Sequence, residues 1–427
     1  MGINMASKII IQGGKPLCGE VTISGMKNAA LPILFATILV RGTCTLENIP
    51  PVNDISLSLE ILRRMGATVE YLDRTTVRID TSRVMPGTSP RELVSIIRGS
   101  SYLLGAELGR FGKAGSGWPG GCDFGVRPLN LHFKGFEALG ATVQNIGDQI
   151  QIDAPNGLTG SYVYFDLASV GATANVMLAA VLAEGTTVIE NAAREPHIVD
   201  LANFLNTCGA NITGAGTTII KIRGVKELHG CQYAIIPDMI EAGTYMVAAA
   251  ATGGSVKVCS VIPKHVEIIM AKLTEMGVEI IEEDDAITVI GSGQRKSISI
   301  TTIPYPGFPT DMHPQFAPLL CIANGVSTIS EGVWENRFRY VEELRKMGAN
   351  ILVGGDMATF IGGEGLIGAS VNATDLRAGA ALIIAGLIAS GKTEISGVKY
   401  IYRGYCDIVE KLQALGADIS EVNLSEN

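Results

Sequence analysis

A motif that occurs six times constrains the fold of this chain more than any other feature. Each copy is an amphipathic helical pattern that ends at a glycine and is followed by a β-branched run, as in Ile61–Ala67 and Gly135–Ala141. The successive glycines are separated by 74, 69, 68, 71 and 68 residues, and a period held this closely indicates repeated structural units. These glycines are Gly66, Gly140, Gly209, Gly277, Gly348 and Gly416.

The local pattern predicts the elements of each unit. The amphipathic helix should end at its glycine, which can take the left-handed conformation of a helix C-cap. A hairpin should follow, as at 68–71 and 76–80 in the first unit. A second helix, apolar all round and therefore buried, precedes each strand that leads into the amphipathic helix. Four such helices are expected at 28–40, 172–184, 241–252 and 378–390.

Six units in 427 residues predict two domains of three units each, in the α/β class. The apolar helices should form the inside of each domain and the strands its outer sheets. We expect the chain to cross between domains near residues 26 and 236. The first domain would then contain residues 1–26 and 237–427, and the second would contain residues 27–236.

Composition excludes several classes of function. The longest apolar stretches, Ala29–Val40 and Ala378–Ala389, are too short to span a membrane and fit buried helices. The net charge of −9 argues against general nucleic-acid binding, although it leaves room for a local cationic pocket. The eight cysteines are scattered without a C-x-x-C pair, which favours reduced thiols in a cytoplasmic protein over disulfides or a zinc site.

The stretch Gly115–Pro128 holds five glycines and two prolines, a density that predicts a loop. Cys122 lies in its middle, five residues before Arg127. A nearby cation lowers the pKa of a thiol and makes it a better acid or nucleophile, so this loop is a candidate for catalysis. Taken alone, Cys122 is better explained as a small buried apolar side chain, as most cysteines are.

Motifs spread over nearly the whole chain resemble the enolpyruvyl transferase family. They agree better with its UDP-N-acetylglucosamine enolpyruvyl transferases than with EPSP synthases, because the thiol loop is absent from the EPSP synthase pattern. The motifs occur in the order found in that family. They are Ser24–Ala29, Trp118–Pro128, Ser169–Thr173, Glu190–Pro196, Pro306–Met312, Glu335–Phe338, Ala373–Arg377 and Arg403–Tyr405.

The resemblance implies two inside-out α/β barrel domains with the active site in the cleft between them. It implies transfer of the enolpyruvyl group of phosphoenolpyruvate to the 3′-hydroxyl of UDP-N-acetylglucosamine with release of phosphate, the first committed step of peptidoglycan synthesis. The reaction is an addition followed by an elimination and requires no metal or organic cofactor. The two substrates are the only partners implied; nucleic acid, membrane and an obligatory protein partner are not.

The resemblance also assigns roles to residues. Cys122 would be the acid at C3 of phosphoenolpyruvate, could form an adduct with that substrate, and would be the target of fosfomycin. Asp311 would be the base for the 3′-hydroxyl. With Lys27 and Arg403 these residues form the expected catalytic set.

Further residues are expected to bind the substrates. The cations that would hold phosphate and carboxylate are Lys27, Arg98, Arg127 and Arg403, because a guanidinium can bind two oxygens at once. The other expected contacts are Asn28, Pro128, Leu129, Asn130, Leu131, Ser169, Val170, Gly171, Asp311, Val333, Arg337, Asp375 and Arg377.

Plainer interpretations of these residues stay open. Asp311 and Asp375 each precede an apolar helix and could be helix caps, and any of the arginines could be a solvated surface charge. Lys27 opens an apolar helix, where a cation gains nothing from the helix dipole, so an anionic ligand would explain it.

Five positions depart from the pattern of the family. Met239 stands where Arg is common, His197 where Glu is common, and Asn130 where Asp is frequent; Ala174 and His313 are also unusual. We expect His197 to face solvent. An active enzyme is favoured over a catalytically weak UDP-sugar-binding paralogue, an EPSP synthase or a purely structural repeat protein.

Overall fold

The computed structural model describes residues 7–120, 128–291 and 295–423, which form two compact units. The split unit contains the described residues up to Ser24 and those from Pro237 onward, and the continuous unit contains Gly25–Ile236. The two crossings lie side by side, and the chain segments at them are hydrogen-bonded within each unit. In the split unit, the Asp238 N–H donates to the Ser24 carbonyl at 2.9 Å. In the continuous unit, the Met26 N–H donates to the Ile236 carbonyl at 2.7 Å.

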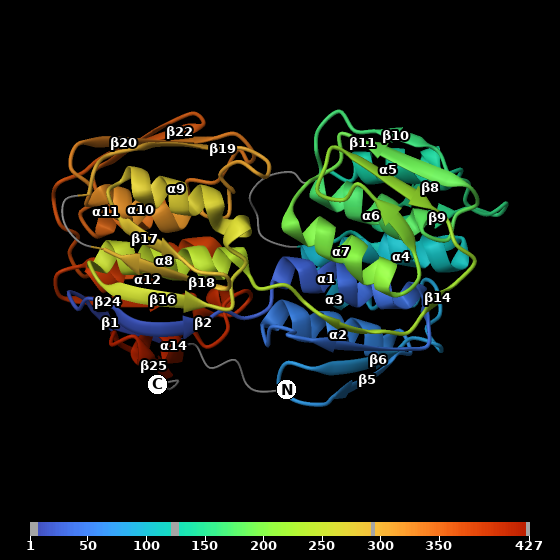
Figure 1. Ribbon diagram of the computed structural model, residues 1–427, viewed down its shortest axis with the longest axis horizontal. Coiled ribbons are helices and arrows are strands. Elements are labelled where there is room, and N and C mark those ends of the chain that lie inside the picture. The colour runs from blue at the N-terminus through green and yellow to red at the C-terminus, as the bar shows by residue number, and fades with distance from the viewer. Residues whose placement is uncertain (1–6, 121–127, 292–294, 424–427) are drawn as a thin grey trace. The chain divides into compact units, whose positions relative to one another are not determined.

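The continuous unit is built from helices and strands in alternation (Figure 1). Its helices are α1 (Lys27–Ala36), α2 (Asn53–Arg64), α3 (Arg91–Val94), α4 (Tyr102–Phe111), α5 (Asn130–Ala138), α6 (Val170–Ala180) and α7 (Pro196–Thr207). Its strands are β3 (Val40–Arg41), β4 (Thr43–Glu47), β5 (Thr68–Tyr71), β6 (Val77–Asp80), β7 (Lys113–Gly117), β8 (Thr142–Ile146), β9 (Gln149–Asp153), β10 (Tyr162–Tyr164), β11 (Thr186–Glu190), β12 (Asn211–Thr213), β13 (Ile219–Arg223), β14 (Leu228–His229) and β15 (Gln232–Ala234).

The split unit has the same kind of alternation. Its helices are α8 (Met239–Thr252), α9 (Glu267–Glu275), α10 (His313–Cys321), α11 (Val341–Lys346), α12 (Leu376–Ile388), α13 (Val398–Ile401) and α14 (Ile408–Ala414). Its strands are β1 (Ser7–Gln12), β2 (Cys18–Thr22), β16 (Ser255–Cys259), β17 (Glu279–Glu282), β18 (Ala286–Ile290), β19 (Ser299–Thr302), β20 (Val326–Glu331), β21 (Ile351–Gly354), β22 (Met357–Ile361), β23 (Ser370–Asn372), β24 (Lys392–Ser396) and β25 (Asp418–Asn423).

Three four-stranded sheets form the outside of the split unit, in the orders β17-β18-β16-β2, β19-β20-β22-β21 and β23-β24-β1-β25. The N-terminal strands β1 and β2 complete two of these sheets, since β2 pairs in parallel with β16 and β1 pairs with both β24 and β25. The continuous unit has sheets of order β15-β4-β6-β5, β10-β11-β13-β12 and β7-β9-β8, with a short β14-β3 pair. The prediction of three repeated units in each half is thus visible in the sheets.

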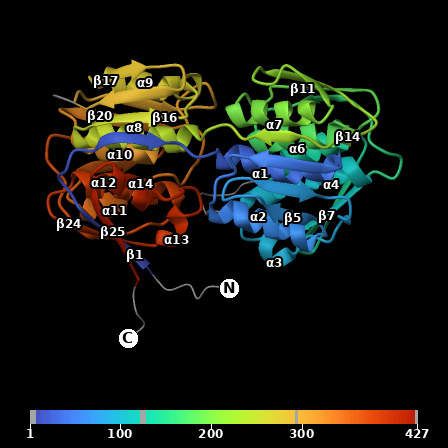
Figure 2. The ribbon, with the colours of Figure 1, turned by 60° about the horizontal axis from the view of Figure 1, so that its bottom comes forward.

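The apolar helices lie inside these sheets, as predicted (Figures 1 and 2). In the split unit, α8, α10 and α12 pack against one another, and nearly every residue of α8 and α12 is buried. In the continuous unit, α4 packs against both α1 and α6. All six repeat glycines have φ between 87° and 106°, which confirms the predicted left-handed helix ends. No helix among the described residues is long and apolar enough to cross a membrane.

One part of the expected Gly-rich loop is a strand. Gly115–Gly117 belong to β7, which lies at the edge of its sheet and pairs with β9. Side chains satisfy the outer edge of this strand: Glu107 Oε2 accepts from Gly115 N–H at 3.1 Å, and Ser89 Oγ donates to the Gly115 carbonyl at 3.3 Å. The prediction of a loop was wrong here because an edge strand with such partners tolerates glycine.

Candidate functional site

Asp311 lies at the centre of an ion cluster in the split unit. Its Oδ1 accepts from Arg337 Nη2 at 2.8 Å and its Oδ2 from Arg377 Nη2 at 3.0 Å. Both guanidiniums are buried, whereas the Asp311 side chain is 32% exposed, so the carboxylate is open to a ligand. The N-cap of α10 falls on Met312, so the interpretation of Asp311 as a cap was wrong. The interpretation of Arg337 and Arg377 as solvated surface charges was also wrong.

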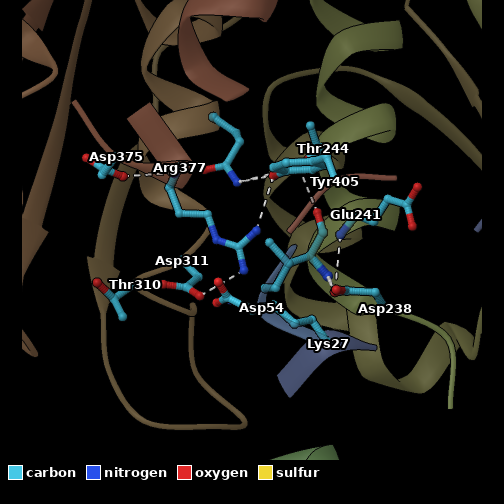
Figure 3. A network of polar contacts seen from close by, with 12 residues as sticks. Lys27, Asp54, Asp238, Glu241, Thr244, Thr310, Asp311, Asp375, Arg377 and Tyr405 are labelled. Atoms are coloured by element: carbon cyan, nitrogen blue, oxygen red, sulfur yellow. Dashed lines mark hydrogen bonds and ion pairs between the residues drawn. The ribbon is translucent and has the colours of Figure 1, made fainter. Parts of the chain in front are cut away.

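Arg377 is held from behind by a buried network of hydroxyl and amide groups (Figure 3). Its guanidinium lies 5.6 Å from the centre of the Tyr405 ring, and Nη1 donates to the Tyr405 hydroxyl at 3.4 Å. That hydroxyl is 2.8 Å from Thr244 Oγ1 and accepts from Gln315 Nε2 at 3.1 Å. These contacts orient the guanidinium toward Asp311.

Asp375 acts as the N-cap of α12. Its Oδ1 accepts from the backbone N–H groups of Arg377 at 2.8 Å and Ala378 at 3.0 Å. The cap interpretation is confirmed for this residue. Because Arg377 is the first-turn residue that receives the cap, Asp375 also fixes the backbone from which the Arg377 side chain extends.

Glu331 connects a further predicted residue, Val333, to this cluster. Its Oε1 accepts from the Val333 and Trp334 N–H groups at 2.7 and 3.0 Å, and its Oε2 accepts from Thr310 Oγ1 at 2.8 Å. One carboxylate therefore fixes both the turn that carries Val333 and the residue that precedes Asp311. The remaining cation predicted in this unit, Arg403, is half-buried in the turn between α13 and α14, two residues before Tyr405.

His313 is fully buried beside this cluster. Its ring packs against those of Phe338 and Tyr340, with centroids 5.1 and 5.5 Å away, and its Nδ1 lies 3.5 Å from Glu331 Oε2. Burial, with the nearby charge of Arg337, holds its pKa well below the usual value. His313 is therefore a neutral packing residue in the wall behind Asp311.

In the continuous unit, Lys27 is the first residue of α1 and has a carboxylate partner. Its Nζ lies 3.3 Å from Asp54 Oδ2, and both side chains are largely buried. Asp54 lies in the first turn of α2, and the sequence analysis did not single it out. This ion pair is a structural explanation for a lysine at the start of α1, beside the expected anionic ligand. Asn28 follows it in α1 and is half-buried.

Two predicted segments of the continuous unit, 128–131 and 169–171, meet at His132, a buried residue of α5. Its Nδ1 is 2.9 Å from Asn175 Nδ2 in α6. A Cβ added to Gly171 would come within 2.9 Å of its ring, which places the 169–171 segment against it. Burial, together with the positive charge of Arg98, lowers the pKa of His132 to about 3. A polar Asn175 inside an otherwise apolar helix is the sequence signal that could have indicated this contact.

The other predicted contacts of this unit lie at two helix starts. Ser169 caps α6, with its Oγ accepting from the Ala172 N–H at 3.3 Å, and Val170 is the first residue of that helix. Leu129 is the N-cap residue of α5 and is buried. Pro128 and Asn130 flank it and are exposed, and Leu131 is half-buried. Cys122 and Arg127 lie outside the described residues.

Three further unusual positions, in addition to His313, are buried. His197 is 8% exposed in the first turn of α7, so the expectation that it faces solvent was wrong; this turn packs inward together with Pro196 and Ile198. Met239 is 4% exposed at the start of α8, whose cap is Asp238. Ala174 is completely buried in α6.

Comparison with known proteins agrees with this architecture. The family model described as EPSP synthase (3-phosphoshikimate 1-carboxyvinyltransferase) matches residues 11–412. The enolpyruvyl transferase NikO from Streptomyces tendae superposes with a TM-score of 0.88 at 27% identity, covering 99% of this chain and all of that one. An EPSP synthase from Acinetobacter baumannii superposes with a TM-score of 0.74 at 21% identity, over 98% of this chain and all of that one, which shows the same fold.

Relatives with higher identity carry a more specific name. The UDP-N-acetylglucosamine 1-carboxyvinyltransferase of Clostridium botulinum is 54% identical, over 97% of this chain and 99% of that protein. A protein of the same name from Streptococcus pneumoniae is 50% identical, over 96% of this chain and 98% of that protein. The chain therefore belongs to the EPSP synthase family of enolpyruvyl transferases and, within it, to the UDP-N-acetylglucosamine 1-carboxyvinyltransferases.

Proposed function

We propose that this protein transfers the enolpyruvyl group of phosphoenolpyruvate to the 3′-hydroxyl of UDP-N-acetylglucosamine and releases phosphate. The observation that carries the proposal is 54% identity, over 97% of the chain, to a relative named for this reaction. The product is a precursor for peptidoglycan, so the enzyme acts in cell-wall synthesis. The alternative of a catalytically weak sugar-binding paralogue is not favoured.

The first half of the reaction needs a base beside the acceptor hydroxyl, and we assign this role to Asp311. Each of its oxygens accepts one guanidinium N–H, and a carboxylate oxygen can accept a second hydrogen bond. The two buried guanidiniums fix the orientation of the carboxylate, so a sugar hydroxyl can donate to it without reorganisation. When the hydroxyl oxygen adds to C2 of phosphoenolpyruvate, its proton passes to Asp311.

The addition also places a proton on C3 of phosphoenolpyruvate, and we assign Cys122 as the acid that supplies it. In the second half, C3 returns a proton to the Cys122 thiolate while the C2–O bond to phosphate breaks. The double bond between C2 and C3 then re-forms in the group that is now attached to the sugar, and inorganic phosphate leaves. Reaction of Cys122 with fosfomycin, detected as an adduct by mass spectrometry, would support this assignment.

The phosphate and carboxylate of phosphoenolpyruvate need cations, and we assign them to Lys27, Arg98, Arg127 and Arg403. Lys27 has Asp54 as a partner at 3.3 Å, a long contact for an ion pair. A phosphate oxygen could therefore share the ammonium, which has three N–H donors, without displacing the carboxylate. This arrangement keeps Lys27 in place before the substrate arrives.

The nucleotide sugar would bind along residues 127–131 and 169–171, with Asn28 and Val333 near the sugar. Backbone N–H groups at such helix starts can bind diphosphate oxygens whatever the side chain is. This explains how Asn130 can replace a more frequent Asp without loss of the site. A cytoplasmic location is part of the proposal and rests on the scattered cysteines.

The proposal is tested by measuring phosphate release from phosphoenolpyruvate with each of two acceptors. We expect release with UDP-N-acetylglucosamine and only background release with shikimate 3-phosphate. The opposite preference would assign the chain to the EPSP synthases. Absence of release with both acceptors, together with measurable binding of UDP-N-acetylglucosamine by calorimetry, would support the sugar-binding paralogue instead.

A further inference from the structure

Three of the scattered cysteines come together in the continuous unit, and none of them is among the residues assigned above. The Sγ atoms of Cys44, Cys208 and Cys231 all lie within 4.8 Å of one another, and those of Cys208 and Cys231 are 3.3 Å apart. Cys44 lies in β4, Cys208 ends α7, and Cys231 precedes β15. We call these residues the three-thiol cluster. Sequence spacing argued against a metal site, but residues far apart along the chain meet here.

The backbone holds the three-thiol cluster in place. The carbonyl of Cys231 accepts from the Thr45 N–H at 2.8 Å, which fixes it beside Cys44. The carbonyl of Cys208 accepts from the His229 N–H at 2.9 Å, which fixes the end of α7 against the segment that leads to Cys231. The three sulfurs are therefore already close together in the folded protein, and such preorganisation favours ligand binding.

Burial leaves the three-thiol cluster open from one side. Cys44 and Cys208 are completely buried, whereas Cys231 is half-exposed. Solvent can reach the group past Cys231, while Cys44 and Cys208 form the closed side. Cys231 is therefore the side from which an ion would approach the sulfurs.

The sulfur spacing fits a thiolate-bound metal. Metal–sulfur bonds of about 2.3 Å place the sulfurs of a three- or four-coordinate site roughly 3.8 to 4.0 Å apart. The cluster is of this size: its Cys208–Cys231 pair, at 3.3 Å, is somewhat closer than this spacing, and no pair is more than 4.8 Å apart. Among the residues that the structure describes, the group contains no fourth Cys, His or carboxylate ligand, whereas a structural zinc site takes four.

We propose that the three-thiol cluster binds a soft, thiophilic metal ion, Cu(I), through three sulfurs. Soft thiolate ligands select Cu(I), and a set of three suits an ion that accepts low coordination. As each copper–sulfur bond forms, the proton of that thiol passes to solvent, and the copper stays in the +1 state. No oxidant or reductant is consumed, and the reaction of the enzyme is not involved.

The test is an anaerobic titration with Cu(I) against the chelator bicinchoninate. Because the thiol of Cys122 could also bind copper, the full-length chain is used with Cys122→Ser as the background. We expect one equivalent to bind and X-ray absorption to give three sulfur neighbours. In the same background, Cys208→Ser with Cys231→Ser should weaken binding at least 100-fold, whereas Cys259→Ser, which changes a cysteine of the split unit, should leave it unchanged.

Three outcomes would overturn the proposal. The first is equal affinity in the background and the double variant, and the second is fewer than three sulfur neighbours. The third is loss of the thiols to a Cys208–Cys231 disulfide, seen as a 2 Da mass decrease, with no copper bound after reduction. If the double variant does not fold by circular dichroism, the single change Cys231→Ser at the half-exposed position serves in its place.

Discussion

Two aspartates in the split unit precede apolar helices, and the structure uses them in opposite ways. Asp375 turns back onto α12 and accepts from two backbone N–H groups. Asp311 stands just before α10 yet accepts from two side chains, Arg337 and Arg377. The residue type is the same and each aspartate lies within two residues of the start of a buried helix, so the residue type and its approximate position do not decide between a cap and a candidate catalytic base.

The difference follows from the first turn of each helix. In α10, Pro314 occupies one of the first helical positions and has no N–H, so fewer backbone donors await a cap. In α12, the corresponding positions are Arg377 and Ala378, whose N–H groups both need an acceptor. The Asp311 carboxylate instead accepts from the two guanidiniums and, in the proposed function, from the substrate hydroxyl.

Removing the charge of Asp311 should have the largest effect on activity. Asp311→Asn keeps the shape of the side chain but removes the proposed base, so kcat should fall on the order of 1,000-fold, in the range for loss of general base catalysis. The measurement is steady-state phosphate release with UDP-N-acetylglucosamine. A kcat within a factor of ten of the unchanged protein would mean that Asp311 is a structural ion-pair residue rather than the base.

Glu107 shows what happens to a buried carboxylate that lacks a guanidinium. Its Oε2 accepts from the backbone N–H groups of Gly87 and Gly115. Burial raises its pKa to about 7 despite these hydrogen bonds. The raised pKa means that the carboxyl contributes most to folding stability below its unfolded pKa, near 4.5, and that this contribution is lost as the pH rises to 7.

The corresponding test is the pH dependence of unfolding in Glu107→Gln. An upward shift of this size implies a loss of about 3 kcal/mol in the free energy of unfolding between pH 4.5 and 8. The amide cannot ionise. Over the same pH range, the free energy of unfolding of the variant, measured by urea denaturation, should therefore fall by about 3 kcal/mol less than that of the unchanged protein. Glu92→Gln, at an exposed position, is the control. Identical pH profiles would show that Glu107 ionises as it would in water.

Sequence patterns were sufficient for the repeat and its buried helices. The six glycines mark the left-handed helix ends, and helices such as α12 are apolar all round and buried. Both features can be recognised from a short stretch of sequence. Pro314 is a local signal against a cap at Asp311, but no local pattern could show its two partners, Arg337 and Arg377, which lie 26 and 66 residues away. The same holds for His197, whose burial depends on how α7 packs, and for the three-thiol cluster, whose members are up to 187 residues apart.

Asp375→Ala should cost stability more than it costs chemistry. It removes an acceptor with two short hydrogen bonds, at 2.8 and 3.0 Å, and loss of such a cap costs about 1 kcal/mol. Activity should fall far less than in Asp311→Asn, because Arg377 keeps its contacts to Asp311 and Tyr405. Urea denaturation and phosphate release on the same samples separate the two effects. A larger loss of activity than in Asp311→Asn would reverse the assignment of the two aspartates.

The smallest effect is expected at Ser169, the cap of α6 in the continuous unit. Its Oγ accepts a single backbone N–H at 3.3 Å, a longer contact than either bond at Asp375. Ser169→Ala should therefore lower the free energy of unfolding by only about 0.5 kcal/mol, the low end for a lost cap. If the proposed nucleotide-sugar site includes this helix start, the KM for UDP-N-acetylglucosamine should rise while kcat is nearly unchanged. A loss of stability as large as that of Asp375→Ala would mean that the number and length of cap hydrogen bonds do not set the strength of a cap in this fold.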